Sequence, residues 1–433
     1  MNKKLLKIIV IVCVVSILAT LPLAACSSTT PTTSTTSTTT TAASGQTLKI
    51  GVMTPTTGPA AEKGAPGGHG ILDCIEYINT ELGGVDGHPI EAVWRDSGYD
   101  AARIATIVKE FIDSGVLMFT THASKEMTAA MELANRAGLP GMSTFTAPEI
   151  YRPPQHIYGQ MPDYGDDFTA FMNYYLENIW KGEGKPKVAL HLLNNSTGYG
   201  ARDAATAMAD ELGIEIVATE EHTATTISET ESLTRIKAKN PDVLYISSTP
   251  APTSVIIKNA RDLGMYPGVT IGLGHAGITK ALVDLAGADV VEGVYGVYPT
   301  VSWDDNVPGI AKAAEYCQKN NPKDYGNMDY LSTWTSALIV RQILKNALEA
   351  VGYDALAQGN AESWALIEKD GIQKLNGYDV EGLHGPVTYT PGDNRLDKDV
   401  KLYQIQSGKI TAITDWISAP LIKYEEFPWW GNK

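Results

Sequence analysis

Short apolar strands alternate with amphipathic helices along most of this chain, and that order constrains the fold more than any other feature. Residues 101–114 show the helical half of the pattern, with Ile104, Val108 and Phe111 on one face. The strand half consists of short apolar runs at residues 48–53, 90–94, 116–119, 187–193 and 243–247. Such an order predicts parallel sheets with helices on both faces, which is the α/β class.

The N-terminal segment has the pattern of an export signal. Three lysines precede an apolar run at residues 8–21, which is too short for a comfortable membrane-spanning helix. The run ends in Leu23-Ala24-Ala25-Cys26, which resembles the lipobox of bacterial lipoproteins. That resemblance implies a signal peptide at residues 1–25, cleavage before Cys26 and lipidation of its thiol, with a plain secretory signal as the alternative. The sequence leaves open whether the anchored protein faces a periplasm or the cell surface.

The composition of the chain after this signal limits the kinds of molecule that the protein can bind. Residues 27–44 are almost entirely Thr and Ser, so we assign residues 26–46 to a flexible tether. Removing residues 1–25 takes away three lysines and no acid, so the formal net charge changes from −15 to −18. An acidic body argues against nucleic acid and anionic membrane surfaces as partners. Cys74 and Cys317 each fall in a helix-like segment, which favours two separate buried thiols over a bridge.

Residues 119–149 predict a strand end, a polar turn, a helix at 124–137, a short strand and a second polar turn. In an α/β unit both turns would lie at the carboxyl ends of neighbouring parallel strands, where open sheets bind ligands. A helix N-terminus lined by hydroxyl groups suits an anion, because free N–H groups and the helix dipole both favour negative charge. The alternative is two ordinary polar turns with Ser124 as an N-cap.

Several short motifs follow one another between residues 48 and 413. They are LKIGVMTPTTGPAAEKG at 48–64, INTELGGVDGHPIE at 78–91, Asp96, Ser124 with Ala129, TAPE at 146–149, Tyr199-Gly200, NPDV at 240–243, ARDLG at 260–264 and Glu292-Gly293-Val294. In this order they resemble the leucine/isoleucine/valine-binding-type substrate-binding proteins, which have the type I periplasmic-binding fold. No single motif is specific, and the resemblance rests on the whole set.

The resemblance implies two αβα lobes joined by three crossover strands, with a ligand cleft that closes by hinge bending. On that basis we expect the first lobe at residues 47–160 and 299–380, the second at 161–298 and 381–420, and a C-terminal tail at 421–433. The resemblance also implies a monomeric extracytoplasmic binding protein that delivers its ligand to the permease of an ABC importer, and not an enzyme. A ligand-sensing module of a receptor or an exported hydrolase is the alternative.

Ligand-binding residues are carried over from the family position by position. Ser124 and Thr146 fall where the family holds a ligand carboxylate with hydroxyl groups, and Tyr199 falls where an aromatic side chain of the second lobe covers the ligand. The candidate ligand-binding residues are Lys63, His122, Ser124, Thr144, Phe145, Thr146, Tyr199, Thr249, His275 and Tyr330.

Two positions depart from the family members that bind amino acids. Those members carry an acid for the ligand ammonium in the turn at residues 271–277, where this chain has His275, and an aromatic side chain where it has Lys63. Because this chain lacks the acid and has an additional cation, we expect its cleft to be more positive than that of the amino-acid-binding members. Burying a ligand ammonium in such a cleft without a counter-charge would cost free energy. We therefore expect a carboxylate ligand without an amino group, such as an organic or aromatic acid, over a branched-chain-type amino acid. A one-residue slip of the alignment, or an acid such as Glu62 or Asp163, is the alternative.

One motif resembles a cofactor site, the G-x-G-x-x-G at residues 272–277. It lies deep in the chain, and Glu292 begins the next strand instead of ending it, where a ribose-binding acid belongs, so a cleft-lining turn is favoured. The sequence has no H-E-x-x-H, no histidine pair at metal spacing and no G-x-S-x-G. We therefore expect no cofactor, no metal and no catalytic residue.

Overall fold

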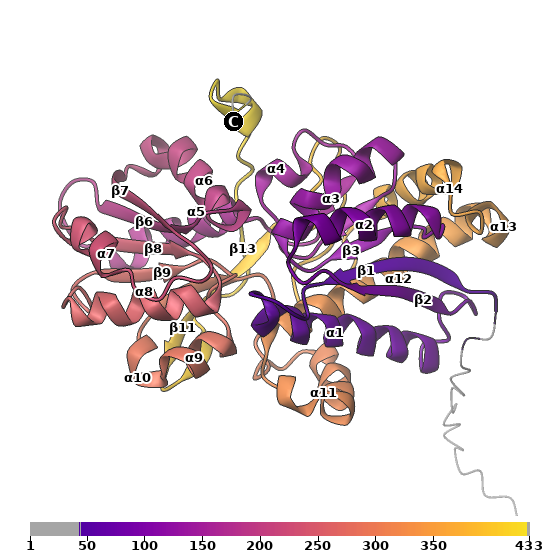
Figure 1. Ribbon diagram of the computed structural model, residues 1–433, viewed down its shortest axis with the longest axis horizontal. Coiled ribbons are helices and arrows are strands. Elements are labelled where there is room, and N and C mark those ends of the chain that lie inside the picture. The colour runs from indigo at the N-terminus through magenta and orange to yellow at the C-terminus, as the bar shows by residue number, and fades with distance from the viewer. Residues whose placement is uncertain (1–42, 44, 431–433) are drawn as a thin grey trace, which may run out of the picture. The chain divides into compact units, whose positions relative to one another are not determined.

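The computed structural model describes residue 43 and residues 45–430, and Figure 1 traces the elements of this part of the chain. The predicted signal peptide and the lipidation at Cys26 lie outside the described residues, as does nearly all of the predicted tether. Among the helices that the structure describes, none has both the length and the apolar character that a membrane span requires.

A parallel sheet in the order β2-β1-β3-β4-β5, with the helices packed on it, forms what we call the first lobe. Its strands are β1 (Leu48–Thr54), β2 (Ile90–Asp96), β3 (Phe119–Thr121), β4 (Gly141–Ser143) and β5 (Ile157–Gly159). One face is covered by α1 (Ala61–Thr80), α11 (Pro308–Asn320) and α12 (Met328–Val351), and the other by α2 (Ala101–Asp113) and α3 (Ser124–Ala137) (Figure 1). Because β3 and β4 are parallel neighbours, the two predicted polar turns do leave adjacent strands.

A second sheet in the order β7-β6-β8-β9-β10-β11-β12, with β13 paired to β11, forms the second lobe with its own helices. Its strands are β6 (Lys187–Leu193), β7 (Glu215–His222), β8 (Val243–Ser247), β9 (Thr270–Leu273), β10 (Tyr295–Tyr298), β11 (Asp399–Gln406), β12 (Lys409–Ala412) and β13 (Ile417–Ser418). Helices α5 (Tyr164–Tyr174) and α6 (Ser196–Leu212) cover one face, and α7 (Thr230–Lys237), α8 (Pro250–Asp262) and α9 (Lys280–Ala286) cover the other (Figure 1). Strands β6 to β10 are parallel, and β11 to β13 are antiparallel additions.

Short elements complete the described part of the chain. The single-turn and two-turn helices are α4 (Pro148–Tyr151), α10 (Ala288–Val291), α13 (Tyr353–Leu356) and α14 (Ala361–Leu366). Turns of π-helix extend α5 over Tyr175–Ile179 and α14 over Ile367–Gly371, and 3-10 turns occupy Pro322–Asp324, Ile372–Lys374 and Tyr424–Glu426. This content confirms the α/β fold class that the alternating pattern predicts.

Three element boundaries differ from the sequence-based prediction. The residue pattern predicts helices at about 68–82 and at 201–212 and a strand at 290–298. Helix α1 instead begins at Ala61 and α6 at Ser196, and the first two residues of the predicted strand belong to helix α10, so that β10 begins only at Tyr295. At Gly64 a Cβ atom would lie 2.1 Å from the carbonyl oxygen of Pro55, so only glycine permits this packing. Tertiary packing therefore extends α1 through residues of low helix propensity, which local pattern alone cannot anticipate.

In the C-terminal part, the residue pattern predicts an antiparallel meander with strands at residues 386–389, 401–406 and 409–413, and this prediction is partly correct. Strands β11 and β12 pair as expected, and the turn between them has positive φ at Ser407 (51°) and Gly408 (75°), which suits a tight hairpin. The strand predicted at residues 386–389 is wrong, because only an isolated bridge joins Val387 to Tyr378. Both Cys74 and Cys317 are free and buried, as expected.

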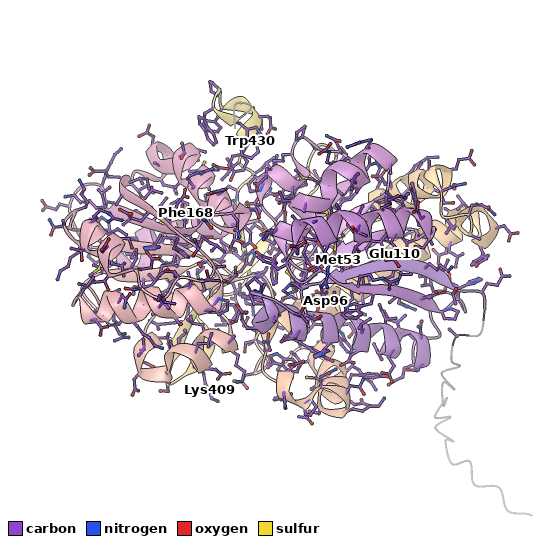
Figure 2. The ribbon with its side chains drawn as sticks, viewed as in Figure 1. Met53, Asp96, Glu110, Phe168, Lys409 and Trp430 are labelled. Carbon is purple, nitrogen blue, oxygen red and sulfur yellow. The ribbon has the colours of Figure 1, made fainter. Side chains whose placement is uncertain are left out.

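Core packing and crossing strands bring the lobes together. Met53 of β1 and Phe168 of α5 are fully buried core side chains (Figure 2). Where the chain passes between the sheets, the Gly159 N–H donates to the Asn394 carbonyl (2.9 Å) and the Leu396 N–H donates to the Gly159 carbonyl (2.8 Å). The lobe boundary predicted at residue 381 stays a prediction. One side chain just before it and three after it pack in the hydrophobic cluster of α1 and α12, which belongs to the first lobe: Val380, Leu383, Val387 and Leu396.

A buried charge cluster lies beside this crossing. The Arg395 guanidinium, only 1% exposed, donates to Asp166 (2.7 Å) on α5 and to Asp393 (3.1 Å). Arg152 also donates to Asp393 (3.3 Å). The C-terminal segment packs nearby, since the ring of Tyr424 is buried with the core of the second lobe. Charges from three distant segments therefore neutralise one another away from solvent.

Candidate functional site

A small buried cavity lies at the carboxyl ends of strands from both sheets. Its lining residues are Ala60, Lys63, Tyr99, His122, Ala123, Ser124, Phe145, Tyr164, Thr197, Thr249 and Ala276. Residues up to Phe145 follow strands of the first sheet, and Thr197, Thr249 and Ala276 follow β6, β8 and β9 of the second. The cavity admits water over about 20 Å³, which is room for roughly one molecule. This is the edge at which open α/β sheets bind ligands.

Hydroxyl groups from both lobes meet at the Ser124 side chain. Its Oγ accepts a hydrogen bond from Ser196 Oγ (3.0 Å) and from the Tyr164 hydroxyl (3.3 Å), and lies 3.4 Å from Thr197 Oγ1. Ser124 is the first residue of α3, and Ser196 and Thr197 are the first two of α6, so two helix N-termini converge here. Hydroxyl donors and two positive helix ends make this point suited to an anionic group.

Glu126 caps the N-terminus of α3 and is not among the site residues predicted from the sequence. Its carboxylate accepts from the backbone N–H groups of His122 (3.1 Å) and Ala123 (2.9 Å) and from the Ser97 hydroxyl. The N-cap residue is Ala123, so the alternative role of Ser124 as N-cap is wrong. Burial raises the pKa of Glu126 to about 8, although these three donors favour its charged form. An acid at the third helical position was the available signal for this cap.

Lys63 is paired with a buried acid that the sequence analysis did not identify. Its Nζ lies 2.6 Å from Asp329 Oδ1 and 4.8 Å from the centre of the Phe145 ring. His122 Nε2 lies 3.6 Å from the same carboxylate, too far for a hydrogen bond. Burial opposes ionisation of Asp329, but Lys63 and His122 together lower its pKa, whereas burial lowers the pKa of His122 against the pull of Asp329.

His275 also has an acidic partner. Its Nδ1 lies 2.7 Å from Asp167 Oδ2, at an angle unfavourable for a hydrogen bond, and its backbone N–H donates to the same oxygen (2.9 Å). The imidazole stacks between Phe145 (4.8 Å between ring centres) and Tyr164 (4.5 Å). Burial raises the pKa of Asp167, and His275 opposes that rise. The expectation of a more positive cleft is therefore wrong, because Lys63 and His275 each lie beside a buried carboxylate.

The structure brings some of the ten candidate residues together and separates others. Lys63, His122, Ser124, Phe145 and Thr249 line the cavity, and His275 lies directly behind Phe145. Four do not line it, since Thr144 contacts Ser336, Thr146 donates to the Ala147 carbonyl, Tyr199 lies under the Arg202 guanidinium and Tyr330 donates to Asp73. Their roles in ligand binding stay predictions. The sequence analysis missed the lining residues Tyr99, Tyr164 and Thr197.

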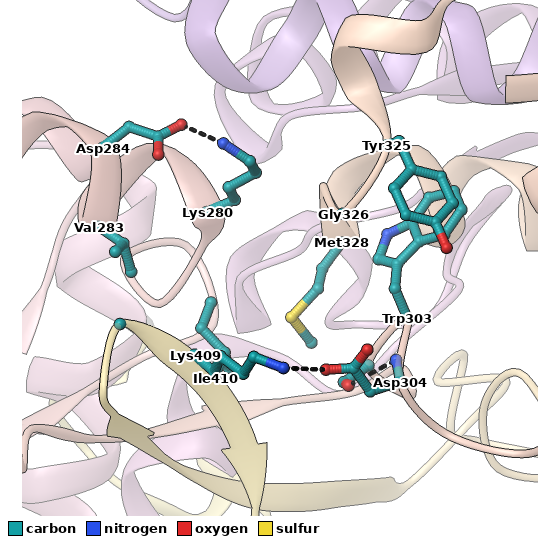
Figure 3. A pocket seen from close by; sticks show the side chains of 12 residues that line it. Lys280, Val283, Asp284, Trp303, Asp304, Tyr325, Gly326, Met328, Lys409 and Ile410 are labelled. Carbon is teal, nitrogen blue, oxygen red and sulfur yellow. Dashed lines mark hydrogen bonds and ion pairs between the residues drawn. The ribbon is translucent and has the colours of Figure 1, made fainter. Parts of the chain in front are cut away.

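A larger groove, admitting water over about 220 Å³, lies between α9, the β11–β12 turn and the loops around Trp303 and Tyr325 (Figure 3). Its charges already pair within the groove, Lys280 with Asp284 and Lys409 with Asp304 (3.8 Å). These ionic side chains are about half exposed or more, so the attraction they offer is largely screened. The smaller buried cavity is therefore the stronger candidate for the ligand site.

A histidine pair in the second lobe was not expected from the scattered positions of histidine. The Nδ1 atoms of His191 and His222 lie 2.9 Å apart, His191 Nε2 contacts Ser232 Oγ (2.9 Å) and His222 Nε2 contacts Ser248 Oγ (2.7 Å). Burial lowers the pKa of His222 to about 3 and also lowers that of His191, although Glu229 opposes the latter shift. In the described part of the chain no group of three or more side chains is arranged to hold a metal ion.

This pair predicts a loss of stability in mild acid. Below a pH of about 6.5 the unfolded chain protonates both rings while the folded protein keeps them neutral, so stability falls as the pH falls. His222→Gln removes one of the two rings and is expected to lose about 1–2 kcal/mol less than the parent between pH 7 and pH 5. Urea unfolding at the two pH values measures this difference. Equal losses in both proteins would show that the pair does not control acid stability.

Comparisons with known proteins agree with this architecture. The sequence profile of a family described as periplasmic binding protein matches residues 47–409. Leu/Ile/Val-binding protein homolog 7 of Brucella suis biovar 1 (strain 1330) is 23% identical over 337 residues, which cover 76% of this chain and 83% of that protein. Leu/Ile/Val-binding protein BraC3 of Rhizobium johnstonii is 23% identical over 371 residues, which cover 84% of this chain and 93% of that protein.

Solved structures share the fold at lower identity. A branched chain amino acid ABC transporter protein from Thermus thermophilus with bound valine superposes with a TM-score of 0.77 at 20% identity, covering 88% of this chain and 98% of the other. A fatty acid ABC transporter substrate-binding protein from Thermomonospora curvata gives a TM-score of 0.74 at 19% identity, covering 89% and 95%.

Proposed function

Since the chain belongs to the periplasmic binding protein family, we propose that it is an extracytoplasmic solute-binding lipoprotein that captures a small carboxylate-bearing ligand between its lobes. The ligand would be an organic or aromatic acid or a branched-chain-type amino acid, delivered as a monomeric complex to the permease of an ABC importer. The predicted lipid at Cys26 would hold the protein at the outer face of the cell membrane.

The observation that carries this proposal is the meeting of hydroxyl groups from both lobes at Ser124. A carboxylate placed there would replace the contacts that Ser196 and Tyr164 now make with Ser124. It would accept hydrogen bonds from α3 on one lobe and α6 on the other, and contacts to both lobes favour the closed state that a transporter recognises. The water-sized cavity implies that the ligand enters an open form and that side chains around Phe145 move apart on binding.

The related proteins support the same ligand class. The structurally similar proteins named above are described with valine and with fatty acid as their ligands, and both molecules carry a carboxylate. Their apolar parts differ widely in size, so the carboxylate is the shared feature. The apolar and aromatic lining of the cavity, from Ala60, Phe145, Tyr164 and Ala276, would pack against such an apolar part.

A thermal-shift screen tests this function. Aliphatic carboxylates, aromatic carboxylates and branched-chain amino acids are compared with the matched primary carboxamides, which keep the shape and remove the anion. We expect at least one carboxylate to raise the melting temperature and its carboxamide to leave it unchanged, because binding to the folded state alone adds stability. Stabilisation by carboxamides as strong as by the acids would contradict an anion site at Ser124.

A further inference from the structure

Lys63 is held in the site by structure within the first lobe alone. It is the third residue of α1, and Asp329 is the second residue of α12, the helix packed along α1. A Cβ atom at Gly70 would lie 2.2 Å from the Tyr330 carbonyl oxygen, so glycine sets the close approach of these helices. The Lys63–Asp329 pair therefore forms whether or not the second lobe closes.

The charge that faces the cavity is positive. Lys63 is among its lining residues beside His122, whose pKa burial lowers, and no Asp or Glu is. Asp329 lies behind Lys63, where it also accepts from the Tyr298 hydroxyl (3.3 Å) and has one oxygen, Oδ2, without a hydrogen-bond partner. Asp167 likewise lies behind the ring of His275. A ligand anion thus meets the Lys63 ammonium group, while a ligand ammonium also meets Lys63, since neither acid lines the cavity.

We propose that Lys63 is a specificity-determining residue. Its fixed positive charge would attract the carboxylate of the ligand and exclude ligands that carry an ammonium group. This inference rests on the proposed function and narrows it to carboxylates without an amino group. The sequence suggested this ligand class because it predicted an excess of positive charge in the cleft. In the structure the charges of the cleft are balanced, and the ligand class follows instead from the position of Lys63 at the cavity. Like charges brought together out of water repel strongly, since little solvent screens them.

The same geometry predicts that one substitution, Lys63→Ala, reverses the preference for ligands without an ammonium group. Lys63→Ala removes the cation and the chain that crosses the Phe145 ring, which opens space in the cavity. The Asp329 carboxylate then faces that space with no lysine beside it. A ligand ammonium would take the place of the lost Nζ and restore the ion pair. Lys63→Ala with Asp329→Asn opens the same space but offers no acid, so it is the matched control.

The test uses ligand pairs that differ only by the α-ammonium group, 4-methylpentanoate with leucine and 3-phenylpropanoate with phenylalanine. Titration calorimetry at pH 7.5 gives the ratio of dissociation constants within each pair. We expect the parent to bind the simple acid at least about ten-fold more tightly, the ratio to reverse in Lys63→Ala, and the reversal to vanish in the double variant, since a charge-assisted hydrogen bond supplies factors of about ten or more.

Four outcomes overturn the inference. A parent that prefers the amino acid of a pair, or a Lys63→Ala ratio equal to that of the parent, refutes the role of Lys63 while leaving the proposed function intact. A parent that binds neither member of any pair refutes both. The single variant Lys63→Ala leaves Asp329 buried without a partner, which can prevent folding. The double variant then gives an independent test. If the double variant keeps the full preference of the parent for the simple acid, Lys63 does not determine that preference.

Discussion

Arg395→Met is expected to lower the free energy of unfolding by about 3–5 kcal/mol, because it leaves the buried Asp166 carboxylate without its cation and leaves Asp393 with Arg152 alone. The guanidinium is almost completely buried between Asp166 and Asp393, and methionine keeps its length without its charge. Burial already raises the pKa of Asp166. In the variant this acid would be protonated more readily, so the stability deficit should grow as the pH rises from 5 to 8.

Urea unfolding of the parent and the variant at both pH values measures this effect. Arg136→Met is the matched control, since Arg136 pairs with Glu132 on the exposed face of α3. An exposed pair of this kind contributes about 0.5 kcal/mol or less. A deficit in Arg395→Met no larger than that of the control would mean that the buried cluster does not hold its charges in the folded protein.

Ser124→Ala combined with Thr197→Val is expected to weaken binding of the stabilising carboxylate by about 100-fold or more. Each hydroxyl would donate one hydrogen bond to a charged group, and such bonds contribute about 1.5–3 kcal/mol each. The two residues belong to opposite lobes, so the double variant also removes the contacts that favour closure. Titration calorimetry with the acid identified in the screen gives the ratio of dissociation constants.

Thr146→Val is the companion variant for this measurement. Its hydroxyl donates to the Ala147 carbonyl and does not line the cavity, so we expect affinity to change by about two-fold or less. Affinity lost in Thr146→Val and kept in Ser124→Ala with Thr197→Val would place the carboxylate at Thr146, which is one of the two hydroxyl groups assigned by resemblance, and not at Ser124. Equal affinity in all three proteins would remove the site from this cavity.

Helix geometry explains why neighbours of several predicted site residues line or support the cavity in their place. The residue pattern predicts that the helix after β6 begins at residue 201, with Tyr199 in the turn before it. Because α6 begins at Ser196, Thr197 and Tyr199 are about 200° apart around the helix, and Thr197 faces the cavity while Tyr199 lies under Arg202. On α12 the neighbours Asp329 and Tyr330 likewise point to Lys63 and Asp73.

Regular local patterns did predict their structures. Helix α3 spans Ser124–Ala137 as predicted, because its apolar spacing fits one face and Gly138 adopts the left-handed conformation that ends a helix (φ 80°). The parallel order of β3 and β4 followed from alternation of strand and helix, and it put Ser124 and Phe145 at the same edge. Ser124 lines the cavity because its position depends only on where a strand ends, and its role in ligand binding stays a prediction.

The sequence by itself therefore determined the class of fold, the edge of the sheets at which side chains converge and the position of Ser124 at that edge. Each of these depends on patterns spanning at most a few dozen residues. Only the tertiary structure decided the charge of the site, because Lys63 and Asp329 are 266 positions apart, and His275 and Asp167 come from different elements. Ion pairing depends on distances of a few ångströms in space, and no local spacing encodes a distance between segments so far apart.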